Sequence, residues 1–245
     1  SDFVVDTFII DTVPNITLAL IPDQCENGDT LILTQGKFAL GNFVYKSEKI
    51  GALTGGKFLP SLVADSIDNI TYVFTDAIGC KDSLSQKIKI HDTTRVTFAI
   101  PASRAEICKN EATFNLSAAT PSGGIYTGKG MVGNKFSPSN ADLGNNYITY
   151  SYTNGDNCKS IITKKIKVND ITPVTFADQT FCLNDAIQTL SGGIPTSGIY
   201  MYSGGGMISD SVFVPSIAGV GSRTMTYTLT NSDGCISIAS AIFTI

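Results

Sequence analysis

The residues of this chain with the most evident chemistry are its six cysteines. Two thiols can be oxidised to a disulfide, and regularly spaced cysteines indicate a disulfide framework in an oxidising compartment. The cysteines fall into three pairs whose members are separated by similar lengths of chain, so we expect disulfides rather than buried free thiols. The pairs are Cys25 and Cys80, Cys108 and Cys158, and Cys182 and Cys235.

Two glycine-rich patterns near the middle of the chain imitate nucleotide-binding loops. Residues 123–129 match the start of a phosphate-binding loop, but Gly130 stands where Ser or Thr would hold Mg²⁺. Gly128, Gly130 and Gly133 have the dinucleotide-binding spacing, but no helix follows them that could bind a pyrophosphate. We interpret these glycines as turn and bulge residues and expect no nucleotide cofactor.

A catalytic or metal centre is not evident in the sequence. His91 is the only histidine, and we interpret it as a solvated linker residue. A histidine-based triad needs a suitably placed base, and no zinc-type cluster of ligands stands out. Asp76, Asp156 and Asp233 lie in turn-forming segments that lack the ligand ladder of a calcium loop. We therefore expect no metal or other cofactor and predict that the protein is not an enzyme.

The composition is that of a folded β protein. Apolar residues make up 42% of the chain and charged residues 16%, which is enough apolar material for a packed core and too little charge for disorder. The net charge of −4 provides no basic field for a phosphate backbone, so we expect no nucleic-acid partner. No apolar run approaches the roughly 20 residues of a membrane span.

One block of sequence occurs three times. A Phe-x-Pro-Ser segment is followed by x-Thr-Tyr and then by a cysteine, and successive cysteines of this kind are 78 (158 − 80) and 77 (235 − 158) residues apart. That period fits a small sandwich of about seven strands and is short for an enzyme domain. The blocks begin at Phe58, Phe136 and Phe213, and their tyrosines are Tyr72, Tyr150 and Tyr227.

Strands follow from alternation of apolar and polar residues. Ile70, Tyr72 and Phe74 share one face of a predicted strand, and turn-forming residues separate this strand from the last strand of each block. The fold class we predict is all-β, with tandem immunoglobulin-like β-sandwich repeats in an extended rod. The rod follows from linkers of only a few residues without a Gly-Ser tract, which leave little room for independent motion.

The predicted repeats have definite bounds. Residues 1–10 correspond to the last strand of a preceding repeat, since Phe8-Ile9-Ile10 matches the end of the later copies. We expect the chain to be an excerpt of a longer protein. Complete immunoglobulin-like repeats are predicted at 11–91, 92–169 and 170–245.

The pairing of the cysteines has two solutions at this point. A disulfide needs Cα atoms within about 7 Å of each other. In each repeat the first cysteine precedes the second strand and the other follows the last hairpin, which places them at opposite ends of the domain. Either a loop folds back to pair them within a repeat, or the bonds join successive repeats as Cys25 to Cys158 and Cys108 to Cys235.

The second repeat resembles immunoglobulin-like repeats of very large Bacteroidetes surface proteins. The resemblance lies in Pro121–Gly130, then Phe136-Ser137-Pro138, then Ile148–Thr153 and Cys158, and the third repeat has most of the same block. Such proteins are exported by type IX secretion and include the gliding-motility adhesins of flavobacteria. The resemblance implies an extracellular, cell-surface location and partners in the export or surface-anchoring machinery.

Triplets of Asp, a hydroxyl residue and a small or aliphatic residue resemble the Bacteroidetes O-glycosylation acceptor motif. Six of them are more than this composition leads us to expect, although Asp-Thr also suits turns and caps. The hydroxyl residues are Thr12, Thr30, Ser66, Ser83, Thr93 and Ser211.

Two functions remain open from the sequence. In the first, the repeats are spacers in the stalk of an adhesin, and their partners are neighbouring repeats of the same long chain. In the second, the repeats themselves bind polysaccharide or another surface ligand. Tyr200 and Tyr202 are candidates for such contacts because two aromatic residues on one strand face can stack on a sugar; the alternative is that they fill a core.

Overall fold

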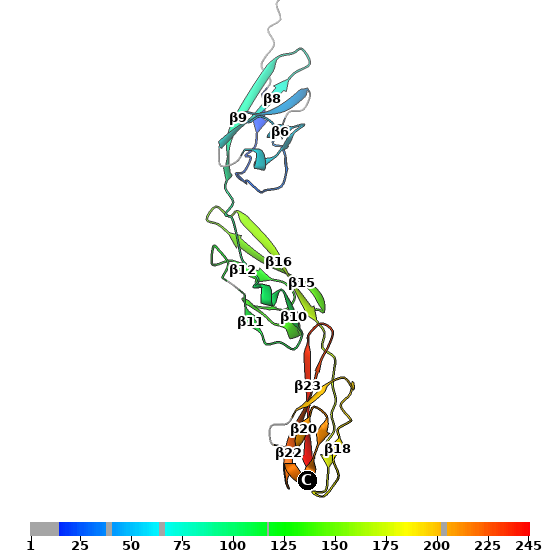
Figure 1. Ribbon diagram of the computed structural model, residues 1–245. Coiled ribbons are helices and arrows are strands. Elements are labelled where there is room, and N and C mark those ends of the chain that lie inside the picture. The colour runs from blue at the N-terminus through cyan, green and yellow to red at the C-terminus, as the bar shows by residue number, and fades with distance from the viewer. Residues whose placement is uncertain (1–14, 38–40, 64–66, 117, 202–204) are drawn as a thin grey trace, which may run out of the picture. The chain divides into compact units, whose positions relative to one another are not determined.

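The structure is a computed structural model that describes residues 15–37, 41–63, 67–116, 118–201 and 205–245 (Figure 1). It divides into two compact units, one of residues 1–96 with 151–161 and the other of residues 97–150 with 162–245. The predicted strand at 1–10 lies outside the described residues.

The first copy of the repeat consists of a four-stranded and a three-stranded sheet with one short extra pair of strands. The sheet orders are β2-β9-β8-β5, β3-β7-β6 and β1-β4, and β2 is parallel to β9 while the other pairs are antiparallel. The elements are β1 (Thr17–Leu18), β2 (Gln24–Cys25), β3 (Leu31–Ile32), β4 (Gly36–Lys37), β5 (Asn42–Ser47), β6 (Leu53–Thr54), β7 (Lys57–Phe58), the 3-10 helix η1 (Pro60–Leu62), β8 (Ile67–Thr75) and β9 (Lys81–His91).

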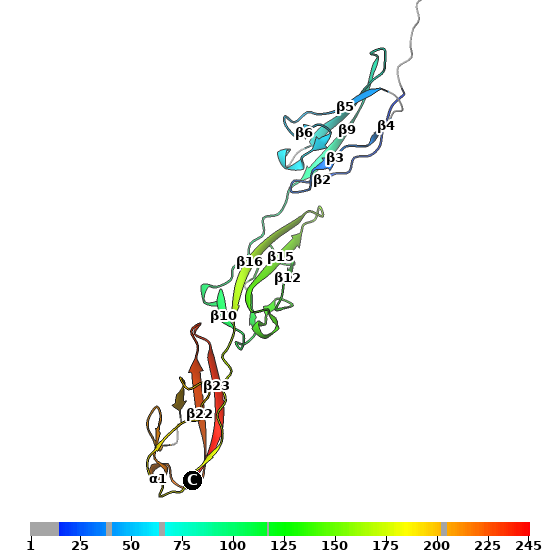
Figure 2. The same cartoon turned by 90° about the vertical axis from the view of Figure 1, so that its right-hand side faces the viewer.

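The second copy repeats the two main sheets in the orders β10-β16-β15-β12 and β11-β14-β13. As with β2 and β9 in the first copy, β10 is parallel to the last strand, β16 (Figure 2). The elements are the 3-10 helix η2 (Ala102–Arg104), β10 (Glu106–Cys108), β11 (Phe114–Asn115), β12 (Ile125–Thr127), β13 (Met131–Val132), β14 (Lys135–Phe136), the 3-10 helix η3 (Pro138–Asn140), β15 (Gly144–Thr153) and β16 (Lys159–Asn169).

The third copy has the orders β17-β23-β22-β19 and β18-β21-β20, again with a parallel first and last strand. Its long hairpin of β22 and β23 is drawn in orange to red in Figure 1. The elements are β17 (Gln179–Thr180), β18 (Gln188–Thr189), β19 (Ile199–Met201), β20 (Met207–Ser209), β21 (Val212–Phe213), the helix α1 (Pro215–Ala218), β22 (Ser222–Thr230) and β23 (Ile236–Thr244).

All three copies have one sheet of four strands and one of three, and the first strand of the four-stranded sheet is parallel to the last strand of the copy. This is the arrangement of an immunoglobulin-like sandwich. The predicted fold class of tandem immunoglobulin-like β-sandwich repeats is therefore confirmed. The bounds of the repeats at 11–91, 92–169 and 170–245 stay a prediction.

The core of each copy forms around the same two aromatic positions. The phenylalanine of the repeated block is fully buried in all three copies, and the tyrosine in the first strand of the long hairpin is at most 2% exposed. Burying a side chain of this size contributes about 1.5–3 kcal/mol relative to leaving it in water. The phenylalanines are Phe58, Phe136 and Phe213, and the tyrosines are Tyr72, Tyr150 and Tyr227.

A second tyrosine packs beside the first in each copy, on the neighbouring strand. The ring centroids are 5.2 Å apart for Tyr45 and Tyr72 and 4.8 Å apart in both other copies. Such pairs add about 0.5–1.5 kcal/mol beyond burial. In the third copy, Gly193 approaches this pair so closely that a Cβ there would lie 2.5 Å from the Tyr227 ring. Its N–H donates to the Tyr200 hydroxyl at 3.1 Å.

The glycines that imitate nucleotide-binding loops lie in turns. Gly128, Gly130 and Gly133 all have φ between +62° and +142°, a conformation that side-chain-bearing residues rarely adopt. A Cβ at Gly130 would also lie 2.8 Å from the Phe136 ring. Backbone geometry and core packing thus account for these glycines.

Candidate functional site

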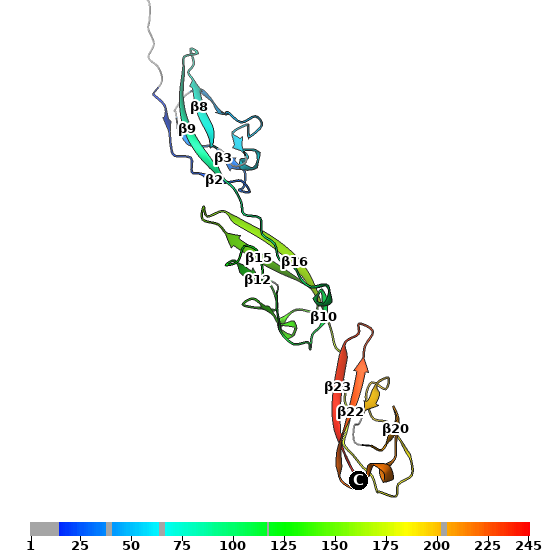
Figure 3. The ribbon, with the colours of Figure 1, turned by 60° about the vertical axis from the view of Figure 1, so that its left-hand side comes forward.

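The candidate functional site is the pair of joints at which consecutive copies of the repeat are bonded. Cys25 is bonded to Cys158, with Cα atoms 5.6 Å apart, and Cys108 to Cys235, with Cα atoms 5.5 Å apart. Of the two pairings that the sequence left open, the structure has the one that joins successive repeats. Figure 3 shows β10, which carries Cys108, beside the turn between β22 and β23. Neither bond contains Cys80, which is half-buried, or Cys182, which is exposed.

We call the region around Cys25 and Cys158 the first joint. Two asparagine amides support the disulfide there. Asn27 Nδ2 donates to the carbonyl oxygen of Lys159 at 2.8 Å, and Asn154 Nδ2 donates to the carbonyl oxygen of Asp92 at 2.9 Å. The first of these hydrogen bonds joins the first repeat to the hairpin turn of the second. The other joins that turn to Asp92, the residue that directly follows β9 and begins the second predicted repeat.

The region around Cys108 and Cys235, the second joint, has the same pair of hydrogen bonds. Asn110 Nδ2 donates to the carbonyl oxygen of Ile236 at 2.8 Å, and Asn231 Nδ2 donates to the carbonyl oxygen of Asp170 at 3.0 Å. Each acceptor is the equivalent of the acceptor in the first joint. One bonding pattern is thus built twice.

The asparagines of the hairpin turns have a second role. In the turn between β15 and β16, Asn154 Oδ1 accepts from the N–H of Asp156 at 3.0 Å and of Cys158 at 2.9 Å. Asn231 Oδ1 accepts from the N–H of Asp233 and Cys235 at the same distances. The side chain that shapes the turn around the cysteine therefore also donates to the linker residue at which its own predicted repeat begins.

His91 lies at the first joint and differs from its prediction as a solvated residue. Its side chain is only 16% exposed and faces two carboxylates. Nδ1 is 3.1 Å from Asp156 Oδ1, and Nε2 is 3.7 Å from Asp23 Oδ2. The distances show ion pairs that form when the imidazole is protonated.

The second joint has a lysine and an asparagine in this place. Lys167 Nζ donates to Glu106 Oε1 at 2.6 Å, and Asn169 Nδ2 donates to the same oxygen at 2.9 Å. The hydrogen bond from Lys167, followed by that from Asn169, lowers the pKa of the Glu106 carboxyl. The hydrogen bond to Glu106 raises the pKa of Lys167. Both groups are solvent-accessible, so water screens this attraction.

Sequence reasoning missed the asparagines of both joints. A signal was available, because Asn follows the first cysteine by two positions in all three copies, at Asn27, Asn110 and Asn184. No comparable sequence pattern indicated the ion pairs of His91, since its contact with Asp156 depends on a hairpin turn far away in the chain.

The predicted O-glycosylation residues lie at different depths. Thr30 and Ser83 are exposed, Thr93 and Ser211 are half-buried, and Thr12 and Ser66 lie outside the described residues. Glycosylation of all six stays a prediction.

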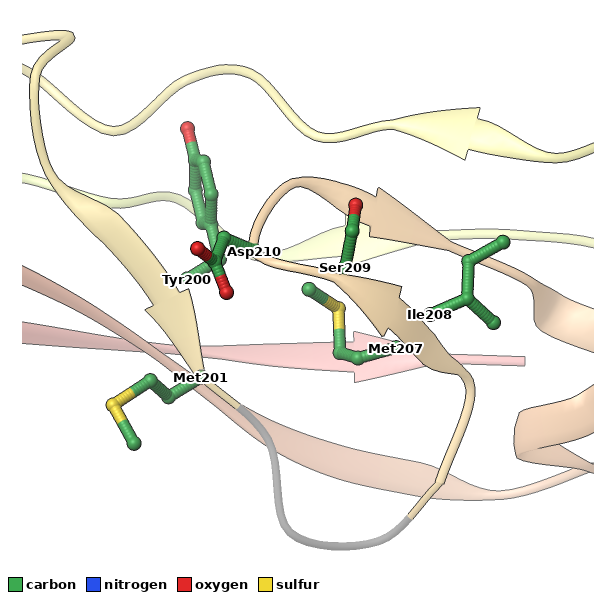
Figure 4. A pocket seen from close by; sticks show the side chains of 6 residues that line it. All are labelled: Tyr200, Met201, Met207, Ile208, Ser209 and Asp210. Atoms are coloured by element: carbon green, nitrogen blue, oxygen red, sulfur yellow. The ribbon is translucent and has the colours of Figure 1, made fainter.

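The two tyrosines predicted as ligand contacts have different outcomes. Tyr202 lies outside the described residues. Tyr200 is 8% exposed and packs against Phe176 and Tyr227, which favours the core role that the sequence left open for it. Its edge borders an open pocket of about 300 Å³ whose other lining residues are Met201, Met207, Ile208, Ser209 and Asp210 (Figure 4).

Among the described residues, no group of three or more His, Cys, Asp or Glu side chains is placed to hold a metal ion. The same part of the chain contains no helix of the length and apolar character that crossing a membrane requires.

Comparison with known proteins gives a likeness in fold. No protein-family model matches the chain, and no curated protein matches it. A Ca²⁺-stabilised adhesin that helps an Antarctic bacterium bind ice is 14% identical, with a TM-score of 0.31 over 95% of this chain and 74% of that one. A Bacteroides ovatus protein from a mixed-linkage glucan utilisation locus, in complex with a heptasaccharide, is 14% identical, with a TM-score of 0.24 over 95% and 69%. Drosophila N-cadherin is 10% identical, with a TM-score of 0.27 over 93% and 74%. Likenesses of this size carry no argument about function.

Proposed function

We propose that this chain is a non-catalytic spacer in the stalk of a large secreted cell-surface adhesin. The observation that carries the proposal is the bonding of consecutive repeats by a disulfide at both joints. An isolated module that acts alone gains nothing from a covalent bond to its neighbour. A stalk does, because its purpose is to hold one end at a distance from the other.

The joints support this role through the number of connections they make. At the first joint the main chain, the disulfide and the hydrogen bond from Asn27 to Lys159 all link the two copies. Two bodies joined at one point can swing about it, whereas several separate connections restrict that swing. The linkers add to this restriction because they are short and contain no flexible tract.

The disulfides also support an extracellular location, since such bonds persist in oxidising compartments. Export by type IX secretion, a role in gliding motility, O-glycosylation and a Bacteroidetes source are the finer parts of the proposal. They depend on the resemblance of the repeated block to the surface repeats of that group. Deletion of the gene in its native host, followed by measurement of gliding, tests the role in motility.

Small-angle X-ray scattering tests the spacer role. We expect the purified, oxidised chain to have a maximum dimension close to that of three domains placed end to end. After reduction, or in a Cys25→Ser and Cys108→Ser double variant, we expect a broader distribution of interatomic distances because the joints gain freedom. A compact oxidised particle would contradict the proposal, as would identical profiles in both states.

A second candidate function is surface-ligand binding by the repeats themselves. The observation that favours it is the open pocket beside β19 and β20, where the exposed Met201 and Ile208 lie close to the polar Ser209 and Asp210. Polysaccharide is the ligand class that the sequence suggests. Saturable binding to a polysaccharide panel, weakened in Asp210→Asn, would support this function over a passive spacer.

A further inference from the structure

The turn after the first cysteine has the same backbone geometry in all three copies. The N–H of the residue three positions later donates to the cysteine carbonyl: Gly28 to Cys25 at 2.8 Å, Glu111 to Cys108 at 3.0 Å and Asp185 to Cys182 at 3.0 Å. In the latter two turns, an acidic side chain also accepts from the cysteine N–H, at 2.9 Å and 2.7 Å. The third turn is therefore held as the second one is.

Two of these turns, those of Cys25 and Cys108, bind the same two chemical groups of the next repeat. In each case a hairpin turn offers a cysteine thiol, which forms the disulfide, and the carbonyl of the next residue, which accepts from the asparagine amide. The cysteine and the asparagine two positions later thus act together as one receptor for a hairpin turn.

In the third turn, the thiol of the cysteine and the side-chain amide of the asparagine are both available for such bonds. Cys182 is an exposed free thiol, and Asn184 is exposed. Within the described residues the Asn184 side chain makes no hydrogen bond. The turn itself is fixed, because the Phe181 N–H donates to the carbonyl oxygen of Thr244 at 2.9 Å and β17 is parallel to β23.

We propose that Cys182 and Asn184 form a docking site for the hairpin turn of a further copy of this repeat. The partner is defined by its chemistry: a turn with an asparagine, a cysteine four positions later and a free carbonyl next to that cysteine, as in residues 154–159 and 231–236. This inference rests on the proposed spacer function, in which repeats are bonded in series.

Bond formation needs an oxidant, and a low-molecular-mass disulfide such as oxidised glutathione balances the reaction. The Cys182 thiolate attacks one sulfur of the glutathione disulfide, which breaks that S–S bond and releases one reduced glutathione. The incoming cysteine thiolate then attacks the mixed disulfide at Cys182 and displaces the second reduced glutathione. Two thiols are oxidised and one disulfide is reduced, and the two thiol protons end on the two molecules of reduced glutathione.

The test is a four-repeat protein in which a second copy of residues 169–245 follows Ile245, since Val168 and Ile245 are equivalent positions. The added copy carries Ile238→Val, an exposed position whose mass change distinguishes its peptides from the original ones. After equilibration with a mixture of oxidised and reduced glutathione, peptides are mapped without reduction. We expect Cys182 linked to the added copy's equivalent of Cys235.

Two variants distinguish the contribution of the Asn184 hydrogen bond from that of the rest of the turn. Asn184→Ala should lower the equilibrium constant for the new bond about fivefold, since one hydrogen bond is lost. Leu183→Ala, which changes the exposed residue between the two groups, should leave the constant unchanged.

A Cys182 that remains alkylatable while the bonds at Cys25 and Cys108 form would overturn the inference. Equal constants for Asn184→Ala and Leu183→Ala would overturn the role of Asn184. The scattering experiment is independent of these results: a mapped Cys182 bond in a compact particle would contradict only the spacer function.

Discussion

The two joints have the same disulfide and the same asparagine hydrogen bonds, but their charged groups differ. In the first joint, His91 lies between Asp23 and Asp156. In the second, Lys167 and Asn169 share one oxygen of Glu106. The charged groups thus vary where the covalent and amide bonds do not.

This difference indicates which contacts connect the repeats. Exposed ion pairs contribute about 0–1 kcal/mol, because water screens the attraction and the side chains lose freedom. A disulfide that closes a long loop contributes several times more. The repeated bonds are therefore the stronger ones. Of these charged contacts, the one between His91 and Asp156 runs between two repeats, whereas Lys167 and Glu106 belong to the same repeat.

The largest expected effect is that of losing one disulfide. Cys158→Ser and Cys235→Ser should each lower the free energy of unfolding by about 2–5 kcal/mol, because the closed loops are long in both cases. The sequence separations of 133 and 127 residues are so similar that we expect nearly equal losses. Urea unfolding followed by far-UV circular dichroism measures both variants.

The control for this pair is Cys182→Ser, which removes an exposed thiol and should leave the urea midpoint unchanged. If the free energy of unfolding lost at one joint is more than twice that lost at the other, the two joints are not equivalent.

The next effect concerns the asparagines of the hairpin turns. Asn154→Asp and Asn231→Asp keep the oxygen that accepts from the turn N–H groups but remove the donor to the carbonyl oxygen of the linker residue, Asp92 or Asp170. Each should cost about 1–3 kcal/mol, because a carboxylate then faces a carbonyl oxygen. Thermal unfolding by circular dichroism measures the loss, and we expect it to be similar at both joints.

Asparagine-to-serine variants at the same positions complete this test. Serine retains a short acceptor for the turn but cannot reach the carbonyl oxygen of the linker residue. If Asn154→Ser is as stable as the unmodified chain, the hydrogen bond to Asp92 contributes nothing at the first joint.

The sequence predicted the fold well because the core repeats along the chain. Phe58, Phe136 and Phe213 recur at a nearly constant period, and a strand's period-2 alternation is visible without tertiary information. The cysteine pairing could not be decided in the same way. It depends on where β2 and β10 lie beside the last strand of their own copy, and a two-residue strand such as β2 has no alternation to read.

His91 and Tyr200 show the same limit for single residues. The expectation of a solvated His91 failed because Asp156 approaches it from a turn 65 positions along the chain (156 − 91). Tyr200 alternates as an outward-facing residue could, but its cross-strand partner Tyr227 and the neighbouring Phe176 bury it. Both outcomes are set by contacts that are distant in sequence.

A smaller effect should follow from the exposed asparagines of the receptor turns. Asn27→Ala and Asn110→Ala each remove one hydrogen bond to a carbonyl and should cost about 0.5–1.5 kcal/mol. Because the disulfide remains, we expect the loss to appear as faster reduction by dithiothreitol rather than as loss of fold. Unequal reduction rates in these two variants would show that the joints differ in more than their charges.

The smallest effect is the pH dependence of the second joint. The pKa of Glu106 lies below its ordinary value of 4.5, so its contribution is present above about pH 4.5 and is lost as pH falls through the lower folded-state pKa. The pKa of Lys167 lies above 10.5, so its contribution is present below about pH 10.5 and is lost as pH rises through the higher folded-state pKa. Glu106→Gln keeps an acceptor for Asn169 but removes the charge that faces Lys167. We therefore expect the difference in thermal midpoint between this variant and the unmodified chain to be constant from about pH 5 to pH 9 and to shrink outside that window. A difference that persists unchanged at about pH 2 would show that the second joint depends on the shape of the Glu106 side chain rather than on its charge.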